Sequence, residues 1–184
     1  MNGSAVLLAV LLVVLAGILV AVEAALATFS RARAQELASD GVAGASRLER
    51  ILADPAPYLN SVLLLRIVAE TAGIVLVAAV VADRVEGYWA NVAIAVAIMS
   101  VVSFVAIGVG PRTLGRQHSE RIAIASAPPV IVLTVLLGPI PKLLIWLGNA
   151  LTPGKGFAEG PFASEVEVRE LVDLAAASSV IESG

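Results

Sequence analysis

The amino-acid sequence predicts an all-α membrane protein with three transmembrane helices, a broken re-entrant or juxtamembrane helix, and a cytoplasmic linker helix. Two observations carry this prediction. Apolar residues make up 59% of the 184-residue chain and charged residues only 15%, and the mean hydropathy is +0.94. A soluble domain averages about half apolar and a quarter charged residues. The apolar residues also gather in runs long enough to cross a bilayer, which takes about 20 mostly apolar residues.

The composition argues against several classes of function. The formal net charge is −3, which argues against nucleic acid as a partner. The chain has no cysteine and one histidine, His118, so it cannot form a disulfide, a thiolate metal site or a multi-histidine site. The sequence shows no nucleophile–base pair and no cofactor-binding loop, and we therefore expect the protein not to be an enzyme.

The first apolar run covers residues 4–29 and predicts the first transmembrane helix. No Lys or Arg precedes Arg31, whereas a secretory signal peptide begins with a basic region and has a shorter apolar core. Glu23 lies about 18 residues inside this run, roughly 27 Å along the axis and near the far edge of a ~30 Å hydrocarbon core. It is a candidate metal ligand or, alternatively, a carboxylate solvated at the membrane surface.

Residues 31–58 are more polar, and their apolar positions repeat at roughly helical intervals with a break around Gly41 and Gly44. This pattern predicts an amphipathic helix pair on the membrane surface. A second apolar run follows at residues 59–82 and predicts the second transmembrane helix.

The second apolar run carries two charged residues, Arg66 and Glu70. Because residues four apart lie on one helix face, we expect their side chains to form an ion pair. Charges inside a spanning helix are costly unless they face protein or a water-filled cavity. The pair is therefore either a structural element that fixes helix packing or part of an ion site. In such a site Glu70 is a candidate metal ligand, and Arg66 is a counter-ion between Glu70 and Glu23.

The third apolar run predicts a transmembrane helix over residues 89–109 that starts at an interfacial Tyr-Trp pair. The run ends at Gly108, Gly110 and Pro111. Small residues here either permit close helix packing or interrupt the helix, as in the ion sites of transporters. These three residues are therefore candidates for an ion pathway.

The fourth apolar region, residues 128–151, contains four prolines and Gly138. Because proline removes a helical hydrogen bond, we expect a broken helix with halves at about 130–137 and 141–151. Each half is too short to span and is therefore expected to be re-entrant or juxtamembrane. A complete but kinked fourth span is the alternative.

Residues 1–152 are thus expected to form a transmembrane domain, and residues 153–184 a soluble cytoplasmic linker. A helix at about 165–177 is predicted there, because Ser164 and Glu167 fit a capping box at its start.

The distribution of arginine predicts the orientation in the membrane. Arginines are concentrated after the first and third spans, and none precedes the first span. The positive-inside rule then places the amino terminus outside the cell membrane and the carboxyl terminus in the cytoplasm.

Three stretches of the sequence resemble the transmembrane module of the cyclin M/CorC family. The first-span ending, EAAL at 23–26 and SRAR at 30–33, is similar to the family's Glu-x-Ala-Leu and Ser/Thr-x-x-Arg. After the third span, GPRTL at 110–114 and SERIA at 119–123 resemble Pro-Lys-x-Leu and Pro-Glu-x-x-Ala. SEVEVRELV at 164–172 is similar to the family's Thr-x-x-Glu-Leu linker helix. The order and spacing of the motifs carry the resemblance.

The resemblance implies transport or efflux of magnesium or another divalent cation, with Mg²⁺ as the expected ion. It also implies a dimer in the lipid bilayer, formed with a second copy or with a related subunit. Paired nucleotide-binding cystathionine-synthase-like (CBS) domains are expected to follow the linker helix in the cytoplasm. The competing interpretation is a non-transporting membrane scaffold or partner subunit, in which an Arg66–Glu70 ion pair replaces the bound cation.

The sequence departs from the family at polar positions where the family is thought to hold the cation. Serines before the first-span Glu are replaced at 20–22 by Val, Ala and Val. Two Asn of the second span match Arg66 and Glu70, and an acidic residue before the third-span Pro matches Gly108. Magnesium needs oxygen ligands, so Glu70, Glu23 and backbone carbonyls near the end of the third span are the remaining candidates.

Overall fold

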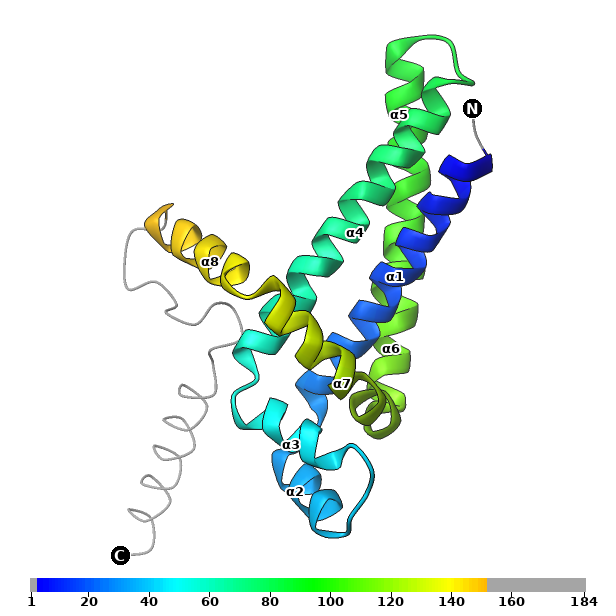
Figure 1. The fold of residues 1–184 in the computed structure, drawn as a ribbon. Coiled ribbons are helices and arrows are strands. Elements are labelled where there is room, and N and C mark those ends of the chain that lie inside the picture. Colours follow the sequence, from blue (N-terminus) through cyan, green and yellow to red (C-terminus); the bar gives the residue numbers. More distant parts are fainter. Residues whose placement is uncertain (1–2, 152–184) are drawn as a thin grey trace, which may run out of the picture.

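The computed structural model describes residues 3–151, and helices joined by short turns make up this range (Figure 1). In chain order the elements are α1 (Gly3–Thr28), α2 (Arg31–Ser39), α3 (Ala45–Ala53), α4 (Ala56–Ala82), α5 (Tyr88–Val102), η1 (Ser103–Val109), α6 (Gly110–Gln117), α7 (Ser119–Leu137) and α8 (Pro139–Leu151). The predicted linker over residues 153–184 lies outside the described residues.

Four helices of the described chain are long and apolar enough to cross a membrane. They are α1, α4, α7 and one long helix, Tyr88–Gln117, that comprises α5, η1 and α6. Three of them run side by side as a bundle, and α7 crosses the bundle obliquely near one end (Figure 1). The described part of the chain is therefore all-helical and that of a multi-pass membrane protein, with four candidate spans where the sequence predicted three.

The third long helix does not end at residue 109, as the glycines and proline predicted. It changes at η1 to a π-helix, in which the Gly110 N–H donates to the Val105 carbonyl five residues back, and then continues as α6. Pro111 has no N–H to donate, and it lies directly after this change of hydrogen-bond pattern. The helix therefore accommodates the proline by a wider turn instead of stopping.

The fourth apolar region breaks at Gly138, as predicted, where the backbone has a φ of 41°. The predicted start of its first half was wrong, because α7 begins at Ser119 and continues through Pro128 and Pro129. Each proline removes a helical hydrogen bond. Burial offsets this loss, because Ala127 and the neighbouring alanine and valine positions of α7 belong to the main core. The resulting 19-residue helix is long enough to span.

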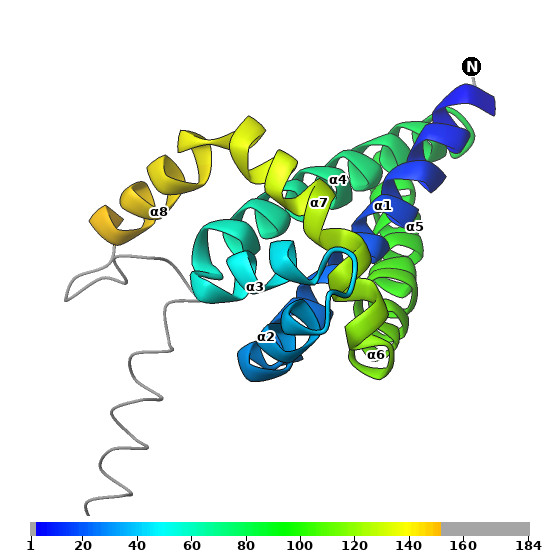
Figure 2. The same ribbon diagram turned by 60° about the horizontal axis from the view of Figure 1, so that its bottom comes forward.

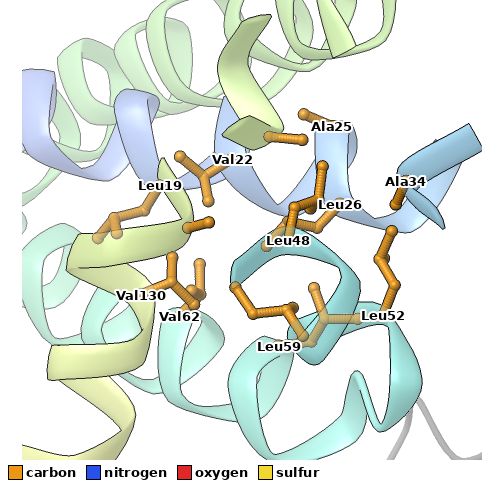
Figure 3. Packing of buried hydrophobic residues seen from close by; sticks show 13 residues of the cluster. Leu19, Val22, Ala25, Leu26, Ala34, Leu48, Leu52, Leu59, Val62 and Val130 are labelled. Carbon is orange, nitrogen blue, oxygen red and sulfur yellow. The ribbon is translucent and has the colours of Figure 1, made fainter. Parts of the chain in front are cut away.

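The main core lies at the end of the bundle where α1 ends and α4 begins. Figure 3 shows its side chains converging from α1, α3, α4 and α7. Leu48 and Ile51 of α3 and Val62 of α4 are completely buried. The predicted helix pair before the second span is confirmed as α2 and α3, and both lie at this end of the bundle (Figures 1 and 2). Gly41 and Gly44 between them have the positive φ values, 74° and 92°, that favour glycine.

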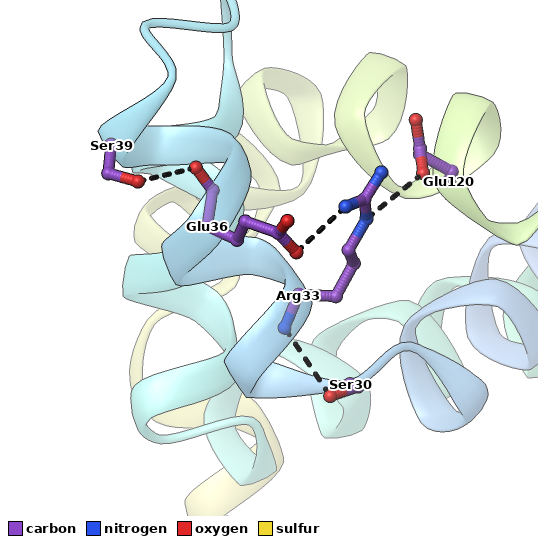
Figure 4. Close-up of polar contacts among 5 residues, drawn as sticks. All are labelled: Ser30, Arg33, Glu36, Ser39 and Glu120. Carbon is purple, nitrogen blue, oxygen red and sulfur yellow. Dashed lines mark hydrogen bonds and ion pairs between the residues drawn. The ribbon is translucent and has the colours of Figure 1, made fainter.

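An exposed ion-pair cluster links α2 to α7 (Figure 4). Arg33 Nη1 donates to Glu36 Oε2 at 2.7 Å, and its Nε lies 3.7 Å from Glu120 Oε2 on α7. The hydrogen bond to Glu36, followed by the negative charge of that residue, raises the pKa of the Arg33 guanidinium. The Ser30 hydroxyl accepts from the Arg33 N–H and caps α2.

Candidate functional site: a charged pair between α1 and α4

The candidate site is an ion pair between the two helices that pack together most extensively, α1 and α4. Glu23 lies five residues before the end of α1, and Arg66 lies ten residues after the start of α4. Arg66 Nε is 3.5 Å from Glu23 Oε2, and the two side chains are 22% and 18% exposed. Both charges are therefore held mostly within protein, as a membrane span requires.

The facing atoms of this pair are buried and have unused hydrogen-bonding capacity. Neither Glu23 Oε2 nor Arg66 Nε has a hydrogen-bond partner among the described residues. The pair is close enough for charge attraction, but the Nε–H does not point at the carboxylate in hydrogen-bonding geometry. A buried charged group without a hydrogen bond costs more than the ~1–3 kcal/mol of a neutral one. Glu23 Oε2 is therefore free to accept from a hydrogen-bond donor, such as a water molecule, or to contact a cation.

Of the two predicted partners of Arg66, Glu70 was wrong and Glu23 is confirmed. The structure pairs Arg66 with Glu23 on the neighbouring helix and not with Glu70 on its own helix. Glu70 is half-buried, and within the described residues it forms no ion pair. One reason is that a basic residue four places before an acidic one is the less favourable order on a helix. Of the two carboxylates expected to flank Arg66, the guanidinium reaches one.

The third long helix packs against α1 close to the pair. A Cβ on Gly17 would lie 2.8 Å from the Ala106 carbonyl oxygen and 3.2 Å from Pro111 Cγ. A Cβ on Gly115 would overlap the backbone of Ala21, two residues before Glu23. These contacts require glycine, since any side chain would push the helices apart. Glu23 therefore lies on a turn of α1 that α4 and α6 both approach.

Gly108 and Gly110 serve the π-helix and not a helix–helix contact. A Cβ on Gly108 would lie 3.2 Å from the Ser103 carbonyl oxygen, and one on Gly110 would lie 3.1 Å from the Val105 carbonyl oxygen. The wide turn thus brings carbonyl groups of its own helix close to both glycines. Nothing in these contacts places Gly108 or Gly110 beside the Glu23–Arg66 pair.

Buried polar side chains on α4 and α7 were missed by the sequence reasoning. Asn60, Ser61 and Ser126 are 6%, 1% and 7% exposed. The hydroxyls of Ser61 and Ser126 donate to carbonyls of their own helices, at 2.8 and 3.2 Å. Asn60 and Ser61 also line a groove of about 840 Å³ between the start of α4 and α8. An amide within an apolar span was the signal that marked this position.

The described residues contain no group of three or more His, Cys, Asp and Glu side chains that could hold a metal ion. A divalent ion at the pair would therefore combine the Glu23 carboxylate with neutral oxygens, such as backbone carbonyls or water. Arg66 would compete with it for the same carboxylate.

The long apolar helices and the charged pair buried between two of them define the class as a multi-pass α-helical membrane protein. Comparison with known families agrees and goes further. Residues 7–184 match the family model described as the cyclin M transmembrane N-terminal domain. The chain belongs to this CNNM family, which confirms the resemblance seen in the motifs.

Several known proteins are also similar to this chain in sequence. The UPF0053 protein Rv2366c of Mycobacterium tuberculosis is 45% identical over 172 residues, covering 94% of this chain and 39% of the relative. The UPF0053 protein Mb2387c of Mycobacterium bovis gives the same values. The UPF0053 inner membrane protein YfjD of Escherichia coli is 31% identical over 134 residues, covering 71% of this chain and 29% of the relative. The chain thus spans about two fifths or less of the length of these relatives.

Proposed function

We propose that this chain is the transmembrane domain of a divalent-cation transporter of the cell membrane, with Mg²⁺ as the transported ion. Family membership supports this proposal, and one observation in the structure carries it. A carboxylate and a guanidinium face each other between α1 and α4, with both facing atoms buried and without hydrogen bonds. Ionisable side chains inside a spanning helix commonly mark ion pathways.

In this proposal Glu23 is the anionic ligand and Arg66 is a built-in counter-ion. Magnesium takes oxygen ligands, and Glu23 Oε2 has no hydrogen bond in the described structure. The guanidinium is permanently charged, so it neutralises the carboxylate when no metal is there and repels a dehydrated cation beside it. Cation entry then requires Arg66 to move away from Glu23, which makes binding weak and reversible.

A second candidate function is a non-transporting membrane scaffold or partner subunit. The observation that favours it is the fixed positive charge of Arg66 together with the lack of an acidic cluster among the described residues. In that case the Glu23–Arg66 pair takes the place of the ion permanently. This replaces the Arg66–Glu70 pair that the sequence suggested for the same role.

Transport by the full-length protein separates the two functions. We expect proteoliposomes containing it to move Mg²⁺, and we expect Glu23→Gln to abolish this flux because it removes the ligand charge. Glu49→Gln, on α3 in the described structure, is the matched control and should keep the wild-type rate. Glu70→Gln should reduce the flux less than Glu23→Gln. An inactive wild type, or an active Glu23→Gln variant, would contradict the proposed mechanism.

Metal binding tests the counter-ion role of Arg66. Calorimetric titration in detergent should show that Arg66→Asn binds Mg²⁺ more tightly than the wild type, because the competing positive charge is gone. If the wild type binds Mg²⁺ tightly and Arg66→Asn does not improve on it, the counter-ion role is wrong.

We also propose that the domain forms a dimer and that CBS domains follow it in the cytoplasm. In the proposed orientation the amino terminus lies outside and the carboxyl terminus lies in the cytoplasm. Because the sequence has no cysteine, a Ser4→Cys variant carries one thiol that a membrane-impermeant reagent can report. We expect labelling from the external face of intact cells. Labelling that appears only after permeabilisation would show that the amino terminus lies in the cytoplasm, opposite to the proposed orientation.

A further inference from the structure

A second polar feature of the molecule lies on the long third helix, away from the charged pair. An open groove of about 390 Å³ runs along one face of η1 and α6. Its lining residues are Phe104, Gly108, Val109, Arg112, Thr113 and Arg116. Four of these residues recur at intervals of four and therefore form one row along the helix. They are Phe104, Gly108, Arg112 and Arg116.

The two arginines of the groove are available for a ligand. Arg112 and Arg116 are exposed, and within the described residues neither guanidinium forms an ion pair or a side-chain hydrogen bond. The Thr113 hydroxyl between them donates to the Val109 carbonyl at 2.9 Å. The two guanidiniums, one helical turn apart, therefore supply the free donors of this groove, and guanidinium groups suit phosphate.

The other end of the groove is apolar. Phe104 is 70% exposed and Val109 is 51% exposed, and Gly108 between Phe104 and Arg112 has no side chain to fill the row. The groove thus passes from an aromatic ring, across a glycine, to two positive charges. This is the order of groups along a phospholipid, from acyl chain to headgroup.

The depth of the groove in a membrane fits the same ligand. Tyr88 and Trp89, 73% and 79% exposed, stand at the start of this helix as an interfacial pair. Phe104 follows Trp89 by 15 residues and Arg112 by 23, which is roughly 23 and 34 Å along the axis. With a hydrocarbon core of about 30 Å, the ring lies among acyl chains and both arginines lie at the headgroup level.

We propose that this groove is a binding site for one anionic phospholipid, whose phosphate lies between Arg112 and Arg116 and whose acyl chain lies on Phe104. A spanning helix with scattered basic residues attracts anionic lipid generally. The groove makes the binding site specific, because it holds the guanidinium groups of Arg112 and Arg116 one helical turn apart, on the same row as the exposed ring of Phe104. The inference is independent of whether the chain transports a cation.

Native mass spectrometry of the full-length protein in detergent tests the site. Phosphatidylglycerol and phosphatidylcholine with identical acyl chains are titrated in parallel, and we expect clearly tighter binding of the anionic lipid. Arg112→Gln and Arg116→Gln should each weaken phosphatidylglycerol binding about fivefold, and the double variant about twentyfold. Phe104→Ala should weaken binding of both lipids, because it removes the acyl contact. All three positions are exposed, so the variants should keep the wild-type elution profile on gel filtration.

Arg121→Gln is the matched control, since Arg121 is an exposed arginine at the start of α7 and does not line the groove. It should change lipid affinity less than twofold. If Arg121→Gln weakened phosphatidylglycerol binding as much as Arg112→Gln or Arg116→Gln does, the lipid would be attracted by the overall positive charge and not by the groove. This result would overturn the proposal. Displacement of the lipid by millimolar inorganic phosphate would identify a site for free anions instead. Lipid bound to monomers and excluded from dimers would identify the groove as an interface between two copies.

Discussion

Arg33 and Arg66 both pair with carboxylates in the described part of the chain, and the Arg33–Glu36 and Arg66–Glu23 pairs differ in almost every physical respect. Arg33 bonds to Glu36 at 2.7 Å with both side chains about half exposed, at 47% and 59%. Arg66 approaches Glu23 to 3.5 Å with both side chains mostly buried and no hydrogen bond between the facing atoms. The better geometry therefore belongs to the pair that is in contact with solvent.

The difference shows that geometry and energetic importance are separate properties of an ion pair. An exposed pair contributes about 0–1 kcal/mol, because water solvates both partners when the pair opens. A buried pair adds little net stability, yet removal of one partner costs roughly 3–5 kcal/mol, because the other charge stays buried without compensation. The imperfect, buried pair is thus the one whose disruption has large consequences.

The largest expected loss of stability follows the removal of one charge of the buried Glu23–Arg66 pair. Arg66→Met should lower the free energy of unfolding by roughly 3–5 kcal/mol, because Glu23 is left without a counter-charge. Denaturant unfolding in micelles, followed by circular dichroism, measures this value. The double variant Glu23→Gln/Arg66→Met should recover most of the loss.

Glu70→Gln is the control for that experiment, because Glu70 lies on the same helix and has no ion pair among the described residues. It should change stability by about 0.5 kcal/mol or less. A double variant as unstable as Arg66→Met would show that lost packing, and not the unpaired charge, explains the effect.

An intermediate effect is expected where α1 and α6 meet beside the buried pair. Gly115→Ala should destabilise the protein by about 1–3 kcal/mol, because the added methyl group overlaps the Ala21 backbone near Glu23. Gly73→Ala is the matched control, since its Cβ would meet its nearest neighbour at an ordinary 3.7 Å. Thermal unfolding of the two variants makes the comparison, and equal melting temperatures would contradict the close approach of α1 and α6.

The smallest effect is expected at the exposed pair. Arg33→Gln should lower the free energy of unfolding by at most about 1 kcal/mol, and 1 M salt should remove the difference, because the screening length falls to about 3 Å. The loss in Arg66→Met should persist in the same salt. Denaturant unfolding of both variants at low and high salt checks this, and a salt-sensitive Arg66→Met variant would place the buried pair in contact with bulk solvent.

Much of the fold was determined by the sequence alone. Apolar runs of sufficient length predicted the α1, α4 and α5 helices, and positive-φ glycines marked the turn between α2 and α3. The break at Gly138 was also predicted correctly. These features are local, because helix length, hydropathy and glycine or proline chemistry act within a few residues of the chain.

The tertiary structure decided what depended on neighbouring helices. The sequence predicted a helix that starts at about residue 130, after Pro128 and Pro129, but burial of α7 against the core keeps the helix continuous from Ser119 through both prolines. The glycines before Pro111 predicted a helix end, but the chain forms a π-turn and continues packed on α1.

The partner of Arg66 was decided in the same way. Spacing along one helix predicted Glu70, whereas the structure places Glu23 of the adjacent helix within 3.5 Å. Sequence spacing describes one helix face. Which charge lies opposite that face depends on how closely two helices pack, and here the small residues along α1, α4 and α6 set that distance.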